Sequence, residues 1–257
     1  MIAGIKAEFR KLFSVRSTYI LIGLALVYVV FYNFYIIGWR GGSSHDLVSL
    51  KNPLYLVIQV ARARGIAPPI LFSSIIAVLL MAHEYRYSTI MYTLTSSNSR
   101  SKTLAAKIIA ITGFTLIFSA FVELLSPSLA ILGLHAHHLS YASQTFYYRE
   151  FIWRVLFYCW AYAMIAILLA IFFRNLVASI VSLFLLPVTV EPLIGLLLNT
   201  NQQQYLPFTA LSGVLNNGLL KSGISEIPAG RSALVVLVYL VIGWTIGWML
   251  FLRRDAN

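Results

Sequence analysis

The chain alternates long apolar runs with short polar segments. An α-helix needs about 20 apolar residues to cross the roughly 30 Å of membrane hydrocarbon. Six runs fit this length, at residues 19–37, 66–82, 104–125, 151–173, 176–198 and 233–252. The second is short, and the fifth contains Pro187 and Pro192, but neighbouring helices can satisfy the backbone groups that proline frees. The pattern predicts an all-α integral membrane protein with six transmembrane helices, forming one domain over residues 1–257.

In the segment before the first run, apolar residues recur at helical spacing and alternate with polar ones. Residues 1–16 predict an amphipathic helix that lies at the membrane interface. Its apolar positions share one face and its cations lie off that face: Ile2, Ile5, Phe9, Leu12 and Phe13 against Lys6, Arg10 and Lys11. The alternative is the basic flank of a signal anchor, although the regular pattern favours the interfacial helix.

Composition supports a membrane protein and argues against nucleic acid as a partner. The chain is 60% hydrophobic and only 11% charged, whereas soluble domains carry roughly 25% charged residues. The formal net charge of +11 has no polar, basic domain to present it to a nucleic acid. A lone cysteine, Cys159, provides neither a disulfide framework nor a thiolate metal site.

The cations predict the orientation, because cytoplasmic segments of membrane proteins are rich in Lys and Arg. With the N-terminus inside, the cytoplasmic segments hold 11 of the 19 cations: Lys6, Arg10, Lys11, Arg16, Arg86, Arg100, Lys102, Lys107, Arg174, Arg253 and Arg254. We therefore expect a multi-pass protein of a prokaryotic plasma membrane with both termini in the cytoplasm.

The predicted outer segments offer little chemistry. Residues 199–231 fit either short helices that dip into the outer leaflet or a surface loop. Three histidines are spaced so that their imidazoles could bind one metal ion: His135, His137 and His138. No cysteine or nearby carboxylate completes a ligand set. We therefore interpret them as loop or interfacial histidines and predict no metal site.

Catalytic motifs are absent from the sequence. It contains no GxSxG, no HExxH and no Walker A lysine motif. The chain itself is therefore predicted not to be an enzyme and to bind no cofactor.

Two acids fall within predicted spans. Glu123 is expected near the interface, whereas Glu191 lies deeper, where a charge costs on the order of 2.5–3.5 kcal/mol. Arg154 enters the neighbouring span from the same side at a similar depth, so we expect Glu191 and Arg154 to pair. Such a pair could line a translocation path or fix helix packing, and the structural role is favoured.

The most distinctive segment is a polar, basic insert between the second and third runs, HEYRYSTIMYTLTSSNSRSKTLAAK at residues 83–107. It resembles the segment between the second and third spans of type 2 ATP-binding-cassette (ABC) permeases. In that family an acid-Tyr-Arg run followed by Thr leads through a polar turn and an Arg to an Ala-Ala-Lys helix start. Ser88 stands where the family often has Gly.

The resemblance implies a permease subunit of an ABC exporter, with a coupling helix that contacts a separate ATPase. By matching positions, Glu84, Tyr85, Arg86 and Thr89 would make this contact, and Arg100 and Lys107 would orient the return to the membrane. ATP and Mg²⁺ would be bound by the partner ATPase. A second permease copy or a homologue would complete a dimer within the membrane lipids.

The rival interpretation is an ATP-independent secondary carrier or channel. Such a protein would place ionisable residues near the bilayer centre, where this chain offers only Glu191, off-centre. The transported substrate and the choice between homodimer and heterodimer stay open, and export rests on the resemblance alone.

Overall fold

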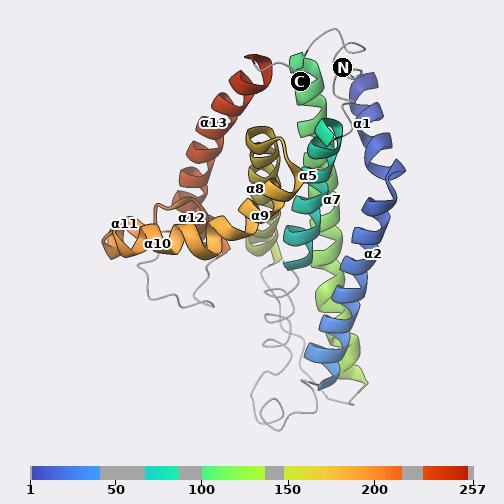
Figure 1. The fold of residues 1–257 in the computed structure, drawn as a ribbon. Helices are drawn as coiled ribbons and strands as arrows, with labels where there is room; N and C mark the ends of the chain where they lie inside the picture. Colours follow the sequence, from blue (N-terminus) through green and yellow to red (C-terminus); the bar gives the residue numbers. More distant parts are fainter. Residues whose placement is uncertain (1, 41–66, 87–99, 137–147, 216–227, 254–257) are drawn as a thin grey trace.

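The computed structural model describes residues 2–40, 67–86, 100–136, 148–215 and 228–253, and helices dominate these ranges (Figure 1). In chain order they are α1 (Ile2–Ser14), α2 (Arg16–Val30), the π-helical η1 (Phe31–Arg40), α5 (Ala67–Arg86), α7 (Arg100–His135), α8 (Tyr148–Phe173), α9 (Leu176–Leu185), the π-helical η2 (Leu186–Val190), α10 (Glu191–Leu196), α11 (Thr200–Gln203), α12 (Pro207–Leu215) and α13 (Ala229–Arg253). The predicted all-α class is confirmed.

Five helical stretches within the described residues are long and apolar enough to cross a membrane: Arg16–Ile36, Ser101–Gly133, Ile152–Phe173, Leu176–Leu196 and Ala229–Arg253. The second predicted run forms α5, but its apolar part, Pro69–Tyr85, is shorter than these. The structure is therefore that of a multi-pass membrane protein with about five candidate spans.

Helix α8 lies at the centre of the bundle and packs against α5, α7, α12 and α13. Small residues on α8, such as Ala163, Ala166 and Ala170, are fully buried and allow neighbouring helices to approach closely. On α13, a Cβ built on Gly247 would lie 2.8 Å from Leu168 Cδ2 of α8. Gly247 therefore provides the space in which Leu168 packs.

The third span was predicted too short. Helix α7 continues past residue 125 to His135 with Pro127 inside it, for a total of 36 residues. Next to the proline, the Ser128 hydroxyl donates a hydrogen bond to the Leu124 carbonyl at 2.9 Å. The amide donor that Pro127 lacks would have bonded the Glu123 carbonyl, and proline is tolerated within membrane helices where neighbouring groups compensate for such a loss.

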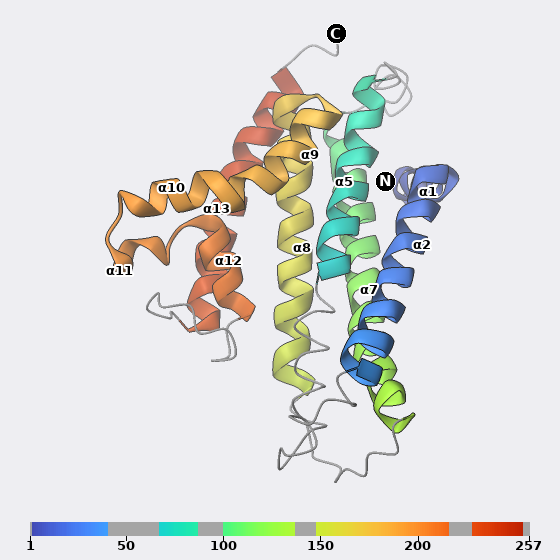
Figure 2. The same cartoon turned by 60° about the horizontal axis from the view of Figure 1, so that its bottom comes forward.

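The fifth span, predicted at residues 176–198 with two prolines inside it, is not a straight helix. It runs through α9, changes to a π-helical turn at Leu186–Val190 around Pro187, and continues as α10. Figures 1 and 2 show α10 projecting away from the bundle rather than along it. Because proline removes a backbone donor and clashes with the preceding turn, a bend at this place has a direct cause.

The chain then returns towards the bundle. The described part of residues 199–231 contains the short α11 and the nine-residue α12, so it is helical rather than an irregular surface loop. Helix α12 packs on α8 and α13 and buries Ala210, Leu211 and Val214.

The predicted N-terminal amphipathic helix forms as α1. An extended Val15 separates it from α2. Its apolar face packs on the bundle, where Leu12 is buried. The start of α1, the end of α5, the start of α7 and the end of α13 lie at the same end of the molecule, which we call the insert end (Figures 1 and 2).

Candidate functional site

Four charged side chains meet at the insert end, in a group that we call the charge cluster: Glu8 and Lys11 of α1, Glu84 of α5 and Lys107 of α7. Lys107 Nζ donates to Glu84 Oε1 at 2.7 Å and to Glu8 Oε2 at 2.8 Å. Lys11 Nζ donates to Glu8 Oε1 and to Glu84 Oε1, both at 2.8 Å. The cluster thus joins three helices through ion pairs.

The cluster is buried and electrically balanced. The side chains of Lys107, Glu8 and Glu84 are only 2%, 4% and 8% exposed, while Lys11 reaches solvent. Two carboxylates face two ammonium groups, which offsets the high cost of taking each charge out of water. Burial opposes the charged form of Lys11, but its hydrogen bonds to Glu8 and Glu84 and their negative charges dominate, so the pKa of Lys11 lies above its ordinary 10.5.

Local sequence explains the cluster in part. Glu8 and Lys11 are three residues apart on α1, a spacing that places them side by side on a helix. Glu8 also lies one turn before the buried Leu12, so it belongs to the helix face that packs on the bundle. Sequence reasoning missed Glu8 and the role of Lys11, and the signal was an acid on an otherwise apolar face.

The insert leaves and re-enters the bundle at this cluster. Arg86 ends α5 and Arg100 begins α7, while Thr89 and the rest of residues 87–99 lie outside the described residues. Glu84 and Lys107, predicted as separate contact and orienting residues, instead bind each other. Glu84 is only 6% exposed, so it is not positioned to touch a soluble partner directly in this structure.

Tyr85 makes a second connection at the insert end. The guanidinium of Arg174 lies over the Tyr85 ring, 5.4 Å from its centroid, in a cation–π contact. Arg174 occupies the tight turn between α8 and α9 with a left-handed φ of 51°. Through this contact the end of α5 is tied to the α8–α9 turn as well as to α1 and α7.

The predicted pair of Arg154 and Glu191 is not among the ion pairs of the residues that the structure describes, and this expectation is corrected. Glu191 Oε2 accepts from the Phe208 amide at 2.8 Å, and Glu191 Oε1 accepts from the Thr209 amide and, at 2.6 Å, from its hydroxyl. Glu191 thereby caps the N-terminus of α12. Glu191 would share the depth of Arg154 only in a straight fifth span, and the bend at Pro187 carries Glu191 to α12 instead.

Two other sequence expectations concern the histidines and Glu123. His135 is exposed at the end of α7, whereas His137 and His138 lie outside the described residues. Within the described ranges no three His, Cys, Asp or Glu side chains lie close enough to hold a metal ion. Glu123, expected at the interface, is buried in α7 at 2% exposure.

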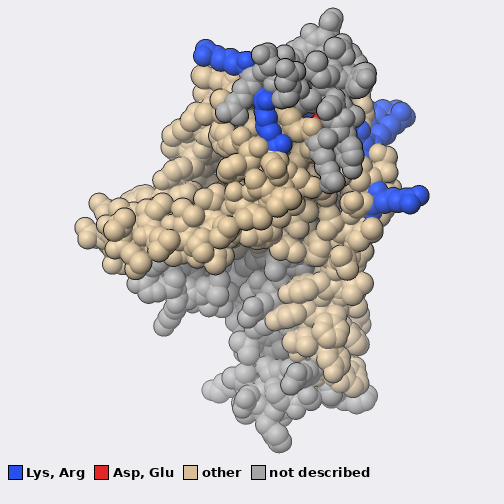
Figure 3. Space-filling model, viewed as in Figure 1, with Lys and Arg blue, Asp and Glu red and all other residues tan. Residues whose placement is uncertain are grey.

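Charge on the surface is uneven. On the face shown in Figure 3, the visible Lys and Arg side chains of the described residues lie towards the insert end, while the surface over α10 to α12 carries none. Leu193, Leu196 and Leu197 are 62%, 82% and 87% exposed there. Such an apolar, uncharged exterior suits contact with lipid.

The helix lengths and this exterior define a multi-pass, all-α membrane protein. Within that class, a family model described as "Protein of unknown function (DUF2705)" matches residues 65–256, and the chain belongs to this family. No curated protein matches the chain.

Proposed function

We propose that this chain is the transmembrane permease subunit of an ABC exporter, coupled to a separate cytoplasmic ATPase through residues 83–107. The observation that carries the proposal is the charge cluster, because ion pairs of 2.8 Å fasten both ends of this insert to α1 and a pair of 2.7 Å joins the two ends to each other. A force applied to the insert would reach three helices at once.

The burial of Glu84 and Lys107 supports a smaller set of residues for the proposed ATPase contact. Glu84 and Lys107 would hold the base of the insert, since both are buried against each other. Arg86, Thr89 and Arg100 would form the contact, with Tyr85 passing movement to Arg174 in the α8–α9 turn. Helix α1 would flank the same ATPase.

The distribution of charge and chain ends agrees with this topology. Helix α1 begins and α13 ends on the same side of the bundle (Figure 1), as six crossings would require if the shorter α5 spans the membrane together with the five longer candidates. Visible cations gather at that side (Figure 3), as expected for a cytoplasmic face. We place both termini in the cytoplasm of a prokaryotic cell.

In the proposed cycle the permease chains and the ATPases have different roles. Two permease chains would form the path, and ATP with Mg²⁺ would bind only to the two ATPases. Closure of the ATPase pair would push the inserts together, and the cluster would transmit this movement to α1, α5 and α7. The bundle would then shift between inward-open and outward-open or closed states, as a population shift driven by differential binding.

Co-purification tests this proposal. The chain is co-expressed with a Walker A ATPase encoded in an adjacent reading frame, and the complex is isolated through a tag on the chain. We expect the wild type to retain the ATPase and an Arg86→Ala, Thr89→Ala double variant to lose most of it. Arg231→Ala, which removes an exposed cation at the opposite end of α13 from Arg253, serves as the matched control and should retain it.

The rival interpretation makes the opposite prediction. If no such ATPase is encoded nearby and none co-purifies, or if the double variant retains it fully, the exporter proposal is wrong. Transport by the purified chain alone in liposomes without ATP would then favour a secondary carrier or channel.

A further inference from the structure

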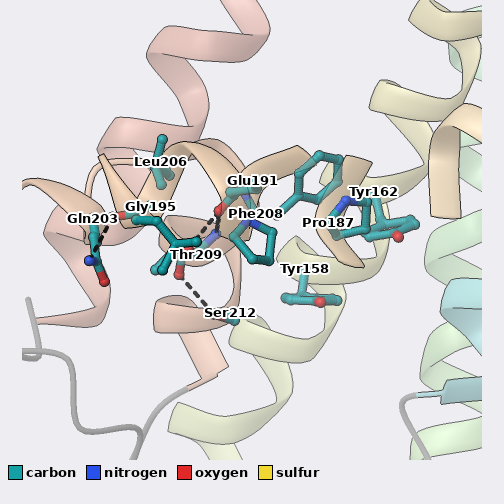
Figure 4. Close-up of a pocket in the computed structure, with 12 residues that line it drawn as sticks. Tyr158, Tyr162, Pro187, Glu191, Gly195, Gln203, Leu206, Phe208, Thr209 and Ser212 are labelled. Atoms are coloured by element: carbon teal, nitrogen blue, oxygen red, sulfur yellow. Dashed lines mark hydrogen bonds between the residues drawn. The ribbon is translucent and has the colours of Figure 1, made fainter. Parts of the chain in front are cut away.

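A hollow of about 460 Å³ lies between α8, α10 and α12, and no residue of the charge cluster lines it (Figure 4). Tyr158 and Tyr162 of α8 line one side, and Phe208 of α12 and Glu191 of α10 line another. The volume falls within the range of small-molecule sites, which is roughly 300–1,000 Å³. No part of the proposed coupling mechanism uses this hollow.

Aromatic rings form its inner wall. The rings of Tyr158 and Tyr162 are stacked with centroids 6.1 Å apart and an interplanar angle of 17°. Phe208 meets Tyr162 edge-on at 5.8 Å. The face of an aromatic ring carries negative potential, so such a wall attracts a positively charged nitrogen.

Glu191 adds a formal negative charge to the same hollow at only 6% exposure. Its oxygens are hydrogen-bonded to the first turn of α12, whose dipole supplies roughly half a positive charge. Among the described residues, no Lys or Arg forms an ion pair with Glu191.

The chemistry of the site selects the kind of cation. Hard metal ions need six or more oxygen ligands, whereas Glu191 is the single carboxylate among the lining residues and already accepts three hydrogen bonds. An ammonium nitrogen with alkyl or aryl substituents needs no such cage, because aromatic faces and one nearby carboxylate suffice. Leu196 also lines the hollow and is 82% exposed, so an apolar substituent can extend onto α10.

We infer that this hollow is a binding site for an organic cation, a substituted ammonium whose nitrogen lies between Glu191 and the rings of Tyr158, Tyr162 and Phe208. The inference is independent of the proposed function, because binding requires only this chain and no ATPase. Failure of one therefore does not decide the other.

The test uses the full chain in lipid nanodiscs, without any partner. Binding of phenyltrimethylammonium is measured by isothermal titration and corrected with empty nanodiscs. The neutral isostere tert-butylbenzene is the matched probe, because it has the same shape without the charge. We expect saturable binding of the cation that is at least tenfold tighter than binding of the neutral isostere.

Variants separate the aromatic from the carboxylate contribution. Tyr158→Leu and Glu191→Gln should each weaken cation binding at least tenfold, whereas Tyr158→Phe, which keeps the ring, should bind within twofold of wild type. If Glu191→Gln fails to fold, the Tyr158 pair alone decides. No cation binding, equal binding of both probes, or unchanged affinity in Tyr158→Leu would overturn the inference.

Discussion

The ammonium group of Lys107 on α7 lies 2.7 Å from the carboxylate of Glu84 on α5, and both side chains are almost fully withdrawn from solvent. These two residues mark the points where the polar insert leaves and rejoins the bundle. Their contact holds the end of α5 to the first turns of α7. Glu8 and Lys11 extend the same contact to the N-terminal helix.

Removing Lys107 should destabilise the protein strongly. Lys107→Met leaves Glu8 and Glu84 buried with one cation between them, and breaking a buried pair costs about 3–5 kcal/mol. Thermal unfolding of the detergent-solubilised protein measures this loss. Lys6→Met serves as the control. Lys6 is exposed on α1, the helix that supplies Glu8, and its replacement should change the free energy of unfolding by less than about 0.5 kcal/mol.

Neutralising both partners together should be less harmful than the single changes suggest. The Lys107→Met, Glu84→Gln double variant keeps the pair of Glu8 and Lys11 and the overall charge balance. We expect its loss of stability to fall short of the sum of the single losses by about 0.5–3 kcal/mol. Strict additivity would show that the two side chains do not interact.

The stability that Lys11 contributes should decrease at alkaline pH. Its pKa in the folded protein is raised above 10.5, so its charged form stabilises the fold, fully below about pH 10.5, and this contribution is lost as the pH rises through the folded pKa. The difference in melting temperature between wild type and Lys11→Met should therefore be constant from pH 7 to 9 and shrink above about pH 10.5. A difference that grows at high pH would contradict the assignment.

The capping role of Glu191 can be measured locally. Glu191→Ala removes the acceptors for the Phe208 and Thr209 amides, so hydrogen exchange should accelerate across α12, Pro207–Leu215. Loss of such a cap costs about 0.5–2 kcal/mol, which corresponds to an increase in exchange rate of roughly two- to thirtyfold where exchange follows local opening. Ser212→Ala removes an exposed hydrogen bond in the same helix and should leave the exchange unchanged. Equal acceleration in both variants would argue against the cap.

Two glycines allow a controlled test of the packing between α8 and α13. A Cβ at Gly247 on α13 would meet Leu168 at 2.8 Å, whereas a Cβ at Gly23 on α2 has nothing within 4 Å. Gly23→Ala should gain up to about 1 kcal/mol from helix propensity, while overpacking of about 1–3 kcal/mol should oppose this gain in Gly247→Ala. Melting temperatures that rise equally in both variants would show that α8 and α13 do not pack as described.

The apolar pattern of the sequence predicted the helices well, because the thickness of the bilayer and the length of a helix are tightly linked. Residues 151–173 became α8 with an extension of three residues at its start. Prolines were harder to interpret: Pro127 stays inside α7, whereas Pro187 lies where the fifth span bends. The two prolines thus had different outcomes, and hydropathy alone does not distinguish them.

The candidate sites could be predicted only in part. Glu84 and Lys107 stood out because they flank a polar insert, but Glu8, the other partner of Lys107, is 99 residues away from it in the chain. Hydropathy indicates which segments are helices and contains no information on which helices touch. For the same reason Glu191 was assigned to Arg154, and its true partners at Phe208 and Thr209 emerged only with the bend.

Site-specific photocrosslinking tests the coupling role of the insert most directly. A photoreactive benzoylphenylalanine replaces Thr89 within the insert, and in a second variant it replaces the exposed Ser128, far along α7 from Arg100. After irradiation of cells that express the chain with its neighbouring ATPase, the Thr89 variant should form an adduct with the mass of chain plus ATPase. The Ser128 variant should not. Absence of this adduct at Thr89, or equal adducts at both positions, would contradict coupling through the insert.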